Sequence, residues 1–496
     1  MPETRDQFMR LTYIHCLALA GLVVRVGVAL ASDRIYHPDE IFQYMEQAHR
    51  LTFGYGYIPW EYRYGTRSWI LPGFISSILF FCKGFQIDNP TVYTVIIKVV
   101  FCILSTSLIY SIYILAREIA GVEAGKLAAT FTCFWYELVY FAHKPLPELL
   151  STYLIAAALA CTVLKPTKTS LLLVGFFSAS SVILRLQYLP VIVVVTVFMY
   201  IKRGKHEIFM AALMFFLVVG IAGCIDYFTW GSFFGSFYNN YLFNAVYGIG
   251  KLFGTERFYY FLESLTVASM GLFAITGILS CFRLNKVWLL LGVLGSIILP
   301  HSVIPHKEYR FVFATIPIFL TLLAIILLDF ISFQKKIITF LPISIFFVLS
   351  LAGLFGKLPF QQRVVYRDLR SQLLAKEEIL QAYLFLYKEP DLAGILNTSA
   401  AWFMTGGYYY LHRDVPIYST EDLKFKDDLR FYVSHIVCPT HQKDTPGFTT
   451  TQKMKTLEIR RQTNPPSHYV ILDVDTKNVL QNGIDDTFTT TVKKRW

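Results

Sequence analysis

Two adjacent carboxylates near the start of the chain are the first side chains whose types and spacing could do chemistry. They are Asp39 and Glu40, in the sequence His37-Pro38-Asp39-Glu40. Proline is favoured at the first position of a helix and anions are favoured in its first turn, so we expect a helix to begin here with both carboxylates ionised. An ionised carboxylate can take the proton of a substrate hydroxyl, which makes Asp39 a candidate general base and Glu40 a candidate for orienting it. The alternative interpretation is that both acids only stabilise the start of a helix.

A short amphipathic helix is predicted to follow, because polar residues recur every three or four positions after Asp39. Its polar face carries Gln43 and Glu46, and we expect it to lie in the membrane interface with its apolar face toward lipid. The loop then adds aromatic rings and further charges, up to residue 68. Aromatic faces stack on sugar rings, while carboxylates and amides bind sugar hydroxyls. The candidate substrate-binding residues of this loop are His37, Gln43, Glu46, Trp60, Glu61 and Arg67.

Composition identifies the elements that must position these residues. The chain has 496 residues, of which 55% are hydrophobic and 16% are charged, and this is far more apolar than a soluble globular protein. We therefore expect a polytopic membrane protein. The net charge of +11 does not indicate nucleic-acid binding, because the basic residues lie mostly in short loops between apolar segments, where membrane topology accounts for them. The eight cysteines imply no disulfide framework, since all but Cys438 lie in or beside apolar segments.

The apolar segments predict most of the membrane spans. We expect them at 11–31, 92–116, 126–142, 148–164, 208–228, 263–281, 287–304, 311–328 and 337–355. Residues 168–202 are predicted to form two short helices that meet at a polar break near the outer leaflet. The apolar stretch 69–86 is short for a span. If it lies along the outer surface, every basic loop falls on the cytosolic side, whereas a crossing would invert one of them, so we expect that it does not cross.

Three further outward loops and the polar break bring charged and polar side chains to the same face. The loop 143–148 is one of them, and the other two contribute candidate site residues. The aromatic run at 225–247 is interrupted by three candidate substrate-binding residues, Asp226, Asn239 and Asn244. Cations at a membrane boundary cost free energy unless they are paired or bind a ligand. Arg and Lys are the side chains that typically bind phosphate. The candidate phosphate-binding residues are Arg185, His306, Lys307 and Arg310.

The C-terminal region, residues 357–496, is more polar and predicts a small α/β domain. We expect a helix near 363–388, followed by short strands at 394–396, 408–412, 415–418, 431–433 and 469–472. Asp473-Val474-Asp475 has the Asp-x-Asp pattern of the metal site in nucleotide-sugar transferases. A turn after a strand explains it better, because no glycine-rich phosphate loop precedes it. We find no cluster of His, Cys and Asp with the spacing of metal ligands and expect no metal.

Three motifs in order resemble glycosyltransferase family 22, the polyprenyl-phosphate-mannose-dependent mannosyltransferases. They are His37-Pro38-Asp39-Glu40 with the polar residues up to Arg67-Ser68, then Asp226-Tyr227-Phe228-Thr229-Trp230-Gly231 with Asn239 and Asn244, then His306-Lys307-Glu308-Tyr309-Arg310-Phe311. The His-Pro-Asp-Glu form is most similar to members that build GPI anchors. The resemblance implies the all-α GT-C fold, with about eleven transmembrane helices. It also implies a transmembrane catalytic domain at 1–356, with its catalytic outer loop at 32–91. The tail at 357–496 matches nothing in the family, and the predicted topology places its α/β domain on the lumenal or periplasmic side.

The function that the resemblance implies is transfer of mannose, with inversion, from a polyprenyl-phosphate-mannose donor to a lipid-linked glycan acceptor. Asp39 would act as base and the cations would hold the departing phosphate. The expected partners are the donor, the acceptor and membrane lipid, without nucleic acid or a cofactor. The expected location is the endoplasmic reticulum membrane in a eukaryote or the inner membrane in a bacterium. The alternatives are a transporter or flippase of lipid-linked sugars, the same chemistry with another polyprenyl-phosphate sugar, and a non-catalytic membrane subunit.

Overall fold

The chain divides into two compact units in the computed structural model, which describes residues 2–331, 337–355, 377–420, 423 and 428–470. Unit 1 comprises Met1–Leu30, Lys98–Phe237 and Phe243–Leu374. Unit 2 comprises Ala31–Ile97, Tyr238–Leu242 and Ala375–Trp496. The units do not follow sequence order as the predicted domains do, and the division into 1–356 and 357–496 stays a prediction.

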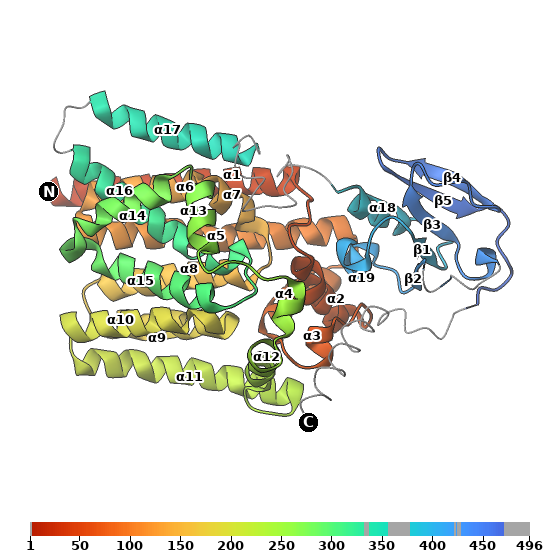
Figure 1. Cartoon of the computed structure of the whole chain (residues 1–496), viewed down its shortest axis with the longest axis horizontal. Coiled ribbons are helices and arrows are strands. Elements are labelled where there is room, and N and C mark those ends of the chain that lie inside the picture. Colours follow the sequence, from red (N-terminus) through yellow and green to blue (C-terminus); the bar gives the residue numbers. More distant parts are fainter. Residues whose placement is uncertain (1, 332–336, 356–376, 421–422, 424–427, 471–496) are drawn as a thin grey trace. The chain divides into compact units, whose positions relative to one another are not determined.

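Unit 1 is built from helices, many of which run side by side in Figure 1. Its main helices are α1 (Pro2–Ala31), α5 (Pro90–Ala120), α6 (Val122–Phe134), α7 (Tyr136–Tyr140), α8 (Pro147–Val163), α9 (Lys168–Leu184), α10 (Leu189–Lys202), α11 (Lys205–Trp230), α13 (Tyr260–Ala268), α14 (Leu272–Cys281), α15 (Leu284–Val303), α16 (Thr315–Ile331) and α17 (Ile337–Leu354). Helix α9 packs between α8 and α11, α10 packs on α15, and α6 packs on α16. Small residues bring α9 and α11 close together: a Cβ on Gly175 of α9 would lie 2.1 Å from the Ala211 carbonyl oxygen of α11.

Four described helices are long and apolar enough to cross a membrane: Thr12–Ala31 within α1, α5, α11 and α15. Two bent pairs raise the number of candidate spans to six if each counts as one. The helical path bends by 119° between residues 136–143 and α8, and by 109° between α13 and α14. The described residues thus confirm a mostly helical chain with several candidate spans, while the number of about eleven stays a prediction.

The predicted spans coincide with helices except at two places. The segment 126–142 is interrupted, because Trp135 is extended (ψ 126°) between α6 and α7. The segment 263–281 is broken in the middle, where Met270 and Gly271 have positive φ angles of 52° and 86°, which a right-handed helix cannot accommodate. The short stretch 69–86 forms α4 (Ile70–Gly84), and its non-crossing placement stays a prediction.

The predicted polar break within 168–202 is confirmed as a break between two short helices. Helix α9 ends at Leu184, Arg185 is extended, and the 3₁₀ turn η3 (Leu186–Tyr188) leads into α10. Pro190 lies in the first turn of α10, where its missing N–H and fixed φ suit a helix start. The backbone is therefore non-helical where Arg185 leaves it.

Unit 2 contains the acidic loop. The predicted helix start at residues 38–39 is confirmed, but the first turns form a π-helix, η1 (Glu40–Met45), which continues as α2 (Glu46–Phe53) and ends at Gly54 with φ 92°. Helix α3 (Trp60–Arg63) and α4 follow, and α12 (Gly235–Tyr241) contributes its last residues. The predicted membrane-facing surface of the first helix is wrong: Ile41 and Ala48 are at most 1% exposed, because this face packs against protein.

A five-stranded mixed sheet completes unit 2, with the order β2-β1-β3-β5-β4. The strands are β1 (Ile395–Asn397), β2 (Ile417–Ser419), β3 (His435–Pro439), β4 (Phe448–Lys453) and β5 (Leu457–Gln462). Strand β1 pairs in parallel with β2 and β3, while β5 is antiparallel to both β3 and β4. Helices α18 (Glu378–Leu386) and α19 (Gly407–Leu411) lie beside this sheet in Figure 1. A mixed sheet with helices confirms the α/β character predicted for the C-terminal region.

The individual strand predictions were partly wrong. Residues 394–396 and 415–418 overlap β1 and β2, but 408–412 cover most of α19, and 431–433 begin at the end of a 3₁₀ turn, η8 (Leu429–Phe431), and stop before β3. Strands β3, β4 and β5 were missed; the alternation of β4 and β5 is largely among polar residues. The predicted helix 363–388 is described only from 377, where α18 lies within it, and 469–472 only at its first two residues, which are not a strand. Asp473-Val474-Asp475 lies outside the described residues.

Candidate functional site

The predicted base lies in the first helical turn of the acidic loop. The side chain of Asp39 is 17% exposed, and its carboxylate lies 3.3 Å from Nδ1 of His37. The Asp39 backbone N–H donates to the same nitrogen at 3.2 Å. Glu40 is only 2% exposed, and its Oε1 accepts the N–H of Tyr36 at 2.8 Å. Of the two adjacent acids, Asp39 is therefore the one that a substrate hydroxyl can more readily reach.

A second acid, Glu61, is held close to Asp39. Glu61 is 6% exposed, and its Oε1 accepts a hydrogen bond of 2.6 Å from Nε2 of Gln43. Burial, together with the negative charge of Asp39, raises the pKa of Glu61 to about 7, although the positive charge of Arg67 opposes this. Two carboxyl groups whose surroundings differ in this way suit an acid and a base role respectively. Glu61 retains a proton near neutrality, while Asp39 is the more exposed member of the pair.

Glu46 lies at the centre of a set of backbone hydrogen bonds. Its Oε1 accepts the N–H groups of Tyr57 at 2.7 Å and Tyr408 at 3.2 Å, and its Oε2 accepts that of Tyr409 at 2.8 Å. Glu46 is fully buried. These bonds satisfy the Glu46 carboxyl oxygens without a substrate. They also favour the helix at 408, because the first N–H groups of a helix lack partners within it and here donate to this carboxyl group.

The other predicted residues of the loop are partly buried. Trp60 begins α3 and is half-buried, and Arg67 is half-buried near Glu61. Asn239 donates from Nδ2 to the carbonyl oxygens of Tyr64 at 3.1 Å and Gly65 at 3.4 Å. Its amide therefore supports the backbone of the loop that carries Arg67, an effect that no local sequence pattern indicates.

Unit 1 contains a separate cluster of buried charges. Arg185 Nη1 lies 3.1 Å from Oε1 of Glu148, and Arg310 Nε lies 3.7 Å from the same oxygen. Both guanidinium groups also lie over the ring of Phe311, at 4.8 and 5.7 Å from its centroid. Arg185 is 7% and Arg310 4% exposed. The structure thus brings together two predicted phosphate-binding residues that are 125 positions apart in the sequence.

The motif 306–310 contains the remaining predicted phosphate-binding residues. Glu308 joins them: its Oε2 lies 2.7 Å from Nε of Arg310, and its Oε1 lies 2.9 Å from Nε2 of His306. Burial acts to lower the pKa of His306, but the hydrogen bond and charge of Glu308 outweigh it and raise the pKa. Lys307 is 6% exposed, and its Nζ donates to the carbonyl oxygen of Glu256 at 2.9 Å.

Unit 1 also contains two predicted substrate-binding residues, Asp226 and Asn244. Asp226 is fully buried, and its Oδ2 accepts both the N–H and the Oγ–H of Ser236, at 2.9 and 2.6 Å. These bonds tie the end of α11 to the start of α12. Asn244 is exposed on the five-residue segment η4 (Leu242–Val246). The sugar-binding role of both residues stays a prediction.

Glu148, the carboxylate that both arginines share, is a site residue that was not predicted from the sequence. A signal existed, because Pro147-Glu148 at the start of α8 has the same proline–acid order as Pro38-Asp39. What could not be read locally is that Glu148 faces Arg185 and Arg310, which come from two other segments.

Comparison with known proteins identifies the family. The sequence profile of the Alg9-like mannosyltransferase family matches residues 17–412. The chain belongs to the Alg9-like mannosyltransferase family. This membership confirms the predicted resemblance to glycosyltransferase family 22, and the chain is a glycosyltransferase of the mannosyltransferase type.

The relatives of this family member include GPI mannosyltransferases. The "GPI mannosyltransferase 3" of Yarrowia lipolytica is 26% identical over 341 residues, covering 64% of this chain and 62% of the relative. The protein of the same name from Drosophila melanogaster is 24% identical over 327 residues, covering 62% of this chain and 55% of the relative. The chain therefore matches less than two thirds of the length of these relatives.

Solved structures establish the fold. The crystal structure of ArnT from Cupriavidus metallidurans bound to undecaprenyl phosphate superposes with a TM-score of 0.60, covering 93% of this chain and 99% of ArnT. Its apo state gives a TM-score of 0.58. The sequence identity to the former is 11%, so the likeness concerns the GT-C fold alone.

Proposed function

We propose that this Alg9-like family member is an inverting mannosyltransferase. It takes mannose from a polyprenyl-phosphate-mannose donor and transfers it to a lipid-linked glycan acceptor of the GPI-precursor type. Family membership supports the sugar, the names of the relatives support the acceptor class, and a GT-C neighbour bound to undecaprenyl phosphate supports a polyprenyl-phosphate donor.

The buried arginine pair around Glu148 is the observation that carries the donor half of the proposal. Arg185 and Arg310 share Oε1 of Glu148, and Nε of Arg185 is buried without a hydrogen-bond partner among the described residues. A buried donor of this kind is costly unless an acceptor such as an anion arrives. Arginine also presents a planar set of donors that matches a phosphate group. We assign this cluster to the phosphate of the donor, where it stabilises the negative charge of the leaving group.

Asp39 is our proposed general base. Inverting transfer needs one group to take the proton of the acceptor hydroxyl. Asp39 fits because it is partly exposed, whereas Glu40 and Glu61 are buried and Glu61 retains its proton near neutrality. Glu61 and Gln43, which are hydrogen-bonded to each other, are placed to bind sugar hydroxyls beside Asp39.

The proposed location is a membrane, with the active site on its lumenal or periplasmic face. Five shorter apolar helices add to the four long ones and the two bent pairs, and we infer that most of them also cross, giving about eleven spans. The compartment would be the endoplasmic reticulum in a eukaryote and the inner membrane in a bacterium.

A transfer assay with the purified full chain in lipid tests this function. The chain is incubated with labelled polyprenyl-phosphate-mannose and a series of lipid-linked glycan acceptors, and the labelled product is isolated and its linkage determined. We expect mannose transfer to a GPI-type precursor, with the same donor lipid carrying glucose as the matched control. Transfer of glucose but not mannose would refute the sugar assignment. Movement of lipid-linked sugar across vesicles without any transfer would identify a transporter instead.

A further inference from the structure

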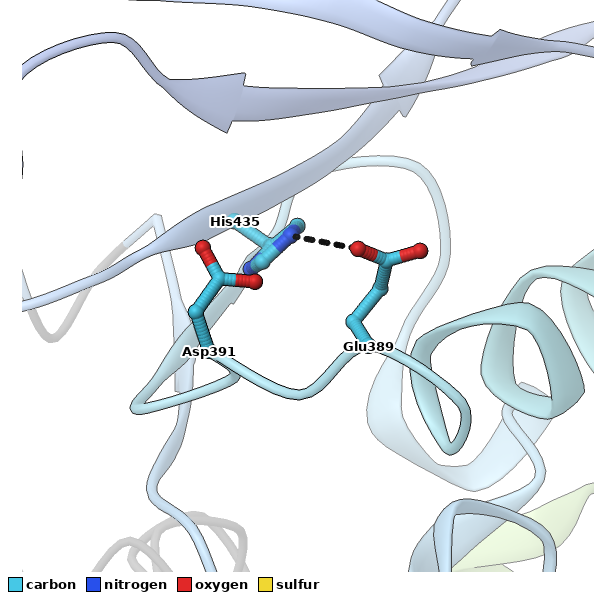
Figure 2. Close-up of side chains that lie close together, drawn as sticks. All are labelled: Glu389, Asp391 and His435. Atoms are coloured by element: carbon cyan, nitrogen blue, oxygen red, sulfur yellow. Dashed lines mark ion pairs between the residues drawn. The ribbon is translucent and has the colours of Figure 1, made fainter.

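Three potential metal ligands converge at one corner of the sheet in unit 2. They are Glu389 and Asp391, in the connection between α18 and β1, and His435, the first residue of β3. One ligand atom from each residue lies within 4.8 Å of the other two. Figure 2 shows the imidazole of His435 between the two carboxylates.

Two potential ligand atoms of these residues are buried without a hydrogen-bond partner among the described residues. His435 is 0% exposed, and its Nε2 makes no hydrogen bond there; Oε2 of Glu389 lies 4.0 Å away. Oδ1 of Asp391 is likewise buried and unbonded. Leaving a buried polar atom unsatisfied is costly. Two such atoms in one cluster indicate a missing partner.

The surrounding hydrogen bonds hold both side chains by their other atoms. Nδ1 of His435 lies 2.9 Å from Oγ of Ser434, whose hydroxyl can in turn donate to the carbonyl oxygen of Gly394 at 3.1 Å. In that arrangement Nδ1 carries the ring proton, and the lone pair of Nε2 is left for a ligand. Arg461 donates from Nε to Oδ2 of Asp391 at 2.8 Å, which leaves Oδ1. Metal-binding histidines and carboxylates are typically oriented by such outer hydrogen bonds.

We propose that Glu389, Asp391 and His435 bind a divalent metal ion of the zinc class. One imidazole nitrogen and two carboxylate oxygens suit Zn²⁺, which binds such atoms at about 2.0–2.2 Å. Ligands at that distance around a tetrahedral ion lie about 3.3 Å apart, so the carboxylates must move inward by about 1 Å. The side chains of Glu389 and Asp391 are 19% and 35% exposed, which gives them room to do so and leaves a path for the ion.

The position of this site indicates a structural role. Strands β1 and β3 run in parallel, with Ile395 opposite His435, so the three ligands lie at the amino ends of both strands. Substrates of open α/β sheets bind at the carboxyl ends. A metal ion here would instead fasten the α18–β1 connection to β3, and it would take no part in the transfer reaction.

Metal titration of the full chain tests the site. The detergent-purified protein is stripped with a chelator, titrated with Co²⁺ as a spectroscopic substitute for Zn²⁺, and analysed for bound Zn²⁺ after dialysis. The variants are His435→Asn, whose amide can retain the bond to Ser434, and Glu389→Gln, which alters a partly exposed side chain. His441→Asn, which removes an exposed histidine of the same unit, is the matched control.

We expect the wild type and the His441→Asn variant to bind about one Co²⁺ per chain. Both site variants should bind it at least about 10-fold more weakly, since they remove a ligand, and removal of even an outer hydrogen bond typically weakens binding 10- to 100-fold. Failure of the wild type to bind stoichiometric metal would overturn the proposal without any variant. Unchanged binding by Glu389→Gln and His435→Asn would show that the metal is held elsewhere.

Discussion

Replacing Glu61 by glutamine should change how the stability of the protein depends on pH. Glu61 is 6% exposed and accepts a hydrogen bond from Gln43. Burial and the nearby charge of Asp39 raise its pKa from 4.5 to about 7. Glutamine has nearly the same size and can still accept the hydrogen bond from Gln43, but it carries no charge at any pH. The substitution therefore removes only the ionisation.

The direction in which stability changes with pH follows from the raised pKa of Glu61. Between pH 4.5 and about 7 the folded protein holds a proton on Glu61 that the unfolded chain has lost, so folding is favoured by low pH. The contribution of Glu61 to the free energy of unfolding is greatest below pH 4.5 and is lost as the pH rises through 7. A rise in pKa of this size corresponds to about 3 kcal/mol between pH 4.5 and 8. Glu46 has a pKa raised in the same way, by burial, to about 7, but it is present in both proteins and cancels in the comparison.

The measurement is unfolding of the wild type and Glu61→Gln from pH 4.5 to 8.5, followed by tryptophan fluorescence in the same detergent. We expect the wild type to lose about 3 kcal/mol more stability over this range than the variant. Glu123→Gln, at a carboxylate whose side chain is 72% exposed, should leave the wild-type profile unchanged. Parallel profiles for the wild type and Glu61→Gln would refute the reasoning, because Glu61 would then have the same proton affinity in the folded and unfolded protein.

Two further substitutions address the chemistry. Asp39→Asn should lower kcat by about 10²–10⁴-fold with donor affinity retained, because it removes the proposed proton acceptor. The exposed Asp88→Asn is its control, and near-normal turnover by Asp39→Asn would exclude Asp39 as base. Lys307→Gln should weaken donor binding by about 10- to 100-fold, the equivalent of one charge-assisted contact of about 1.5–3 kcal/mol. Glu308→Gln should have a smaller effect on the dependence of rate on donor concentration, and equal donor affinity in the wild type and Lys307→Gln would remove Lys307 from the phosphate site.

The sequence by itself determined most of the helical architecture and one of its breaks. Hydropathy over about 20 residues is a local property, and helices appear at nearly every segment where it is high. The polar break at Arg185 and the helix start at Pro38 were also readable, because proline acts on its own backbone and its immediate neighbours. The order of the three motifs along the chain was sufficient to recognise the family, because matching motifs requires no knowledge of which residues are in contact.

What a charged residue does was decided by the tertiary structure. Glu46 and Asp226 have the types and positions of substrate-binding acids, yet their oxygens accept backbone and hydroxyl hydrogen bonds. Arg185 found its partner in Glu148, which the sequence did not single out. These pairings join residues between 10 and more than 360 positions apart, and residue type cannot reveal whether a carboxylate is already satisfied.

The C-terminal region shows the same limit for secondary structure. The aromatic run at Tyr408–Tyr410 favours a strand by intrinsic preference, but it forms a helix whose first N–H groups bind the carboxylate of Glu46, more than 360 positions earlier. Likewise, Glu389, Asp391 and His435 have no metal-ligand spacing in the sequence and meet only because β1 and β3 pair in parallel. A site assembled by strand pairing becomes visible only once the register is known, because the spacing of its residues along the chain is set by the connections between strands and not by the metal.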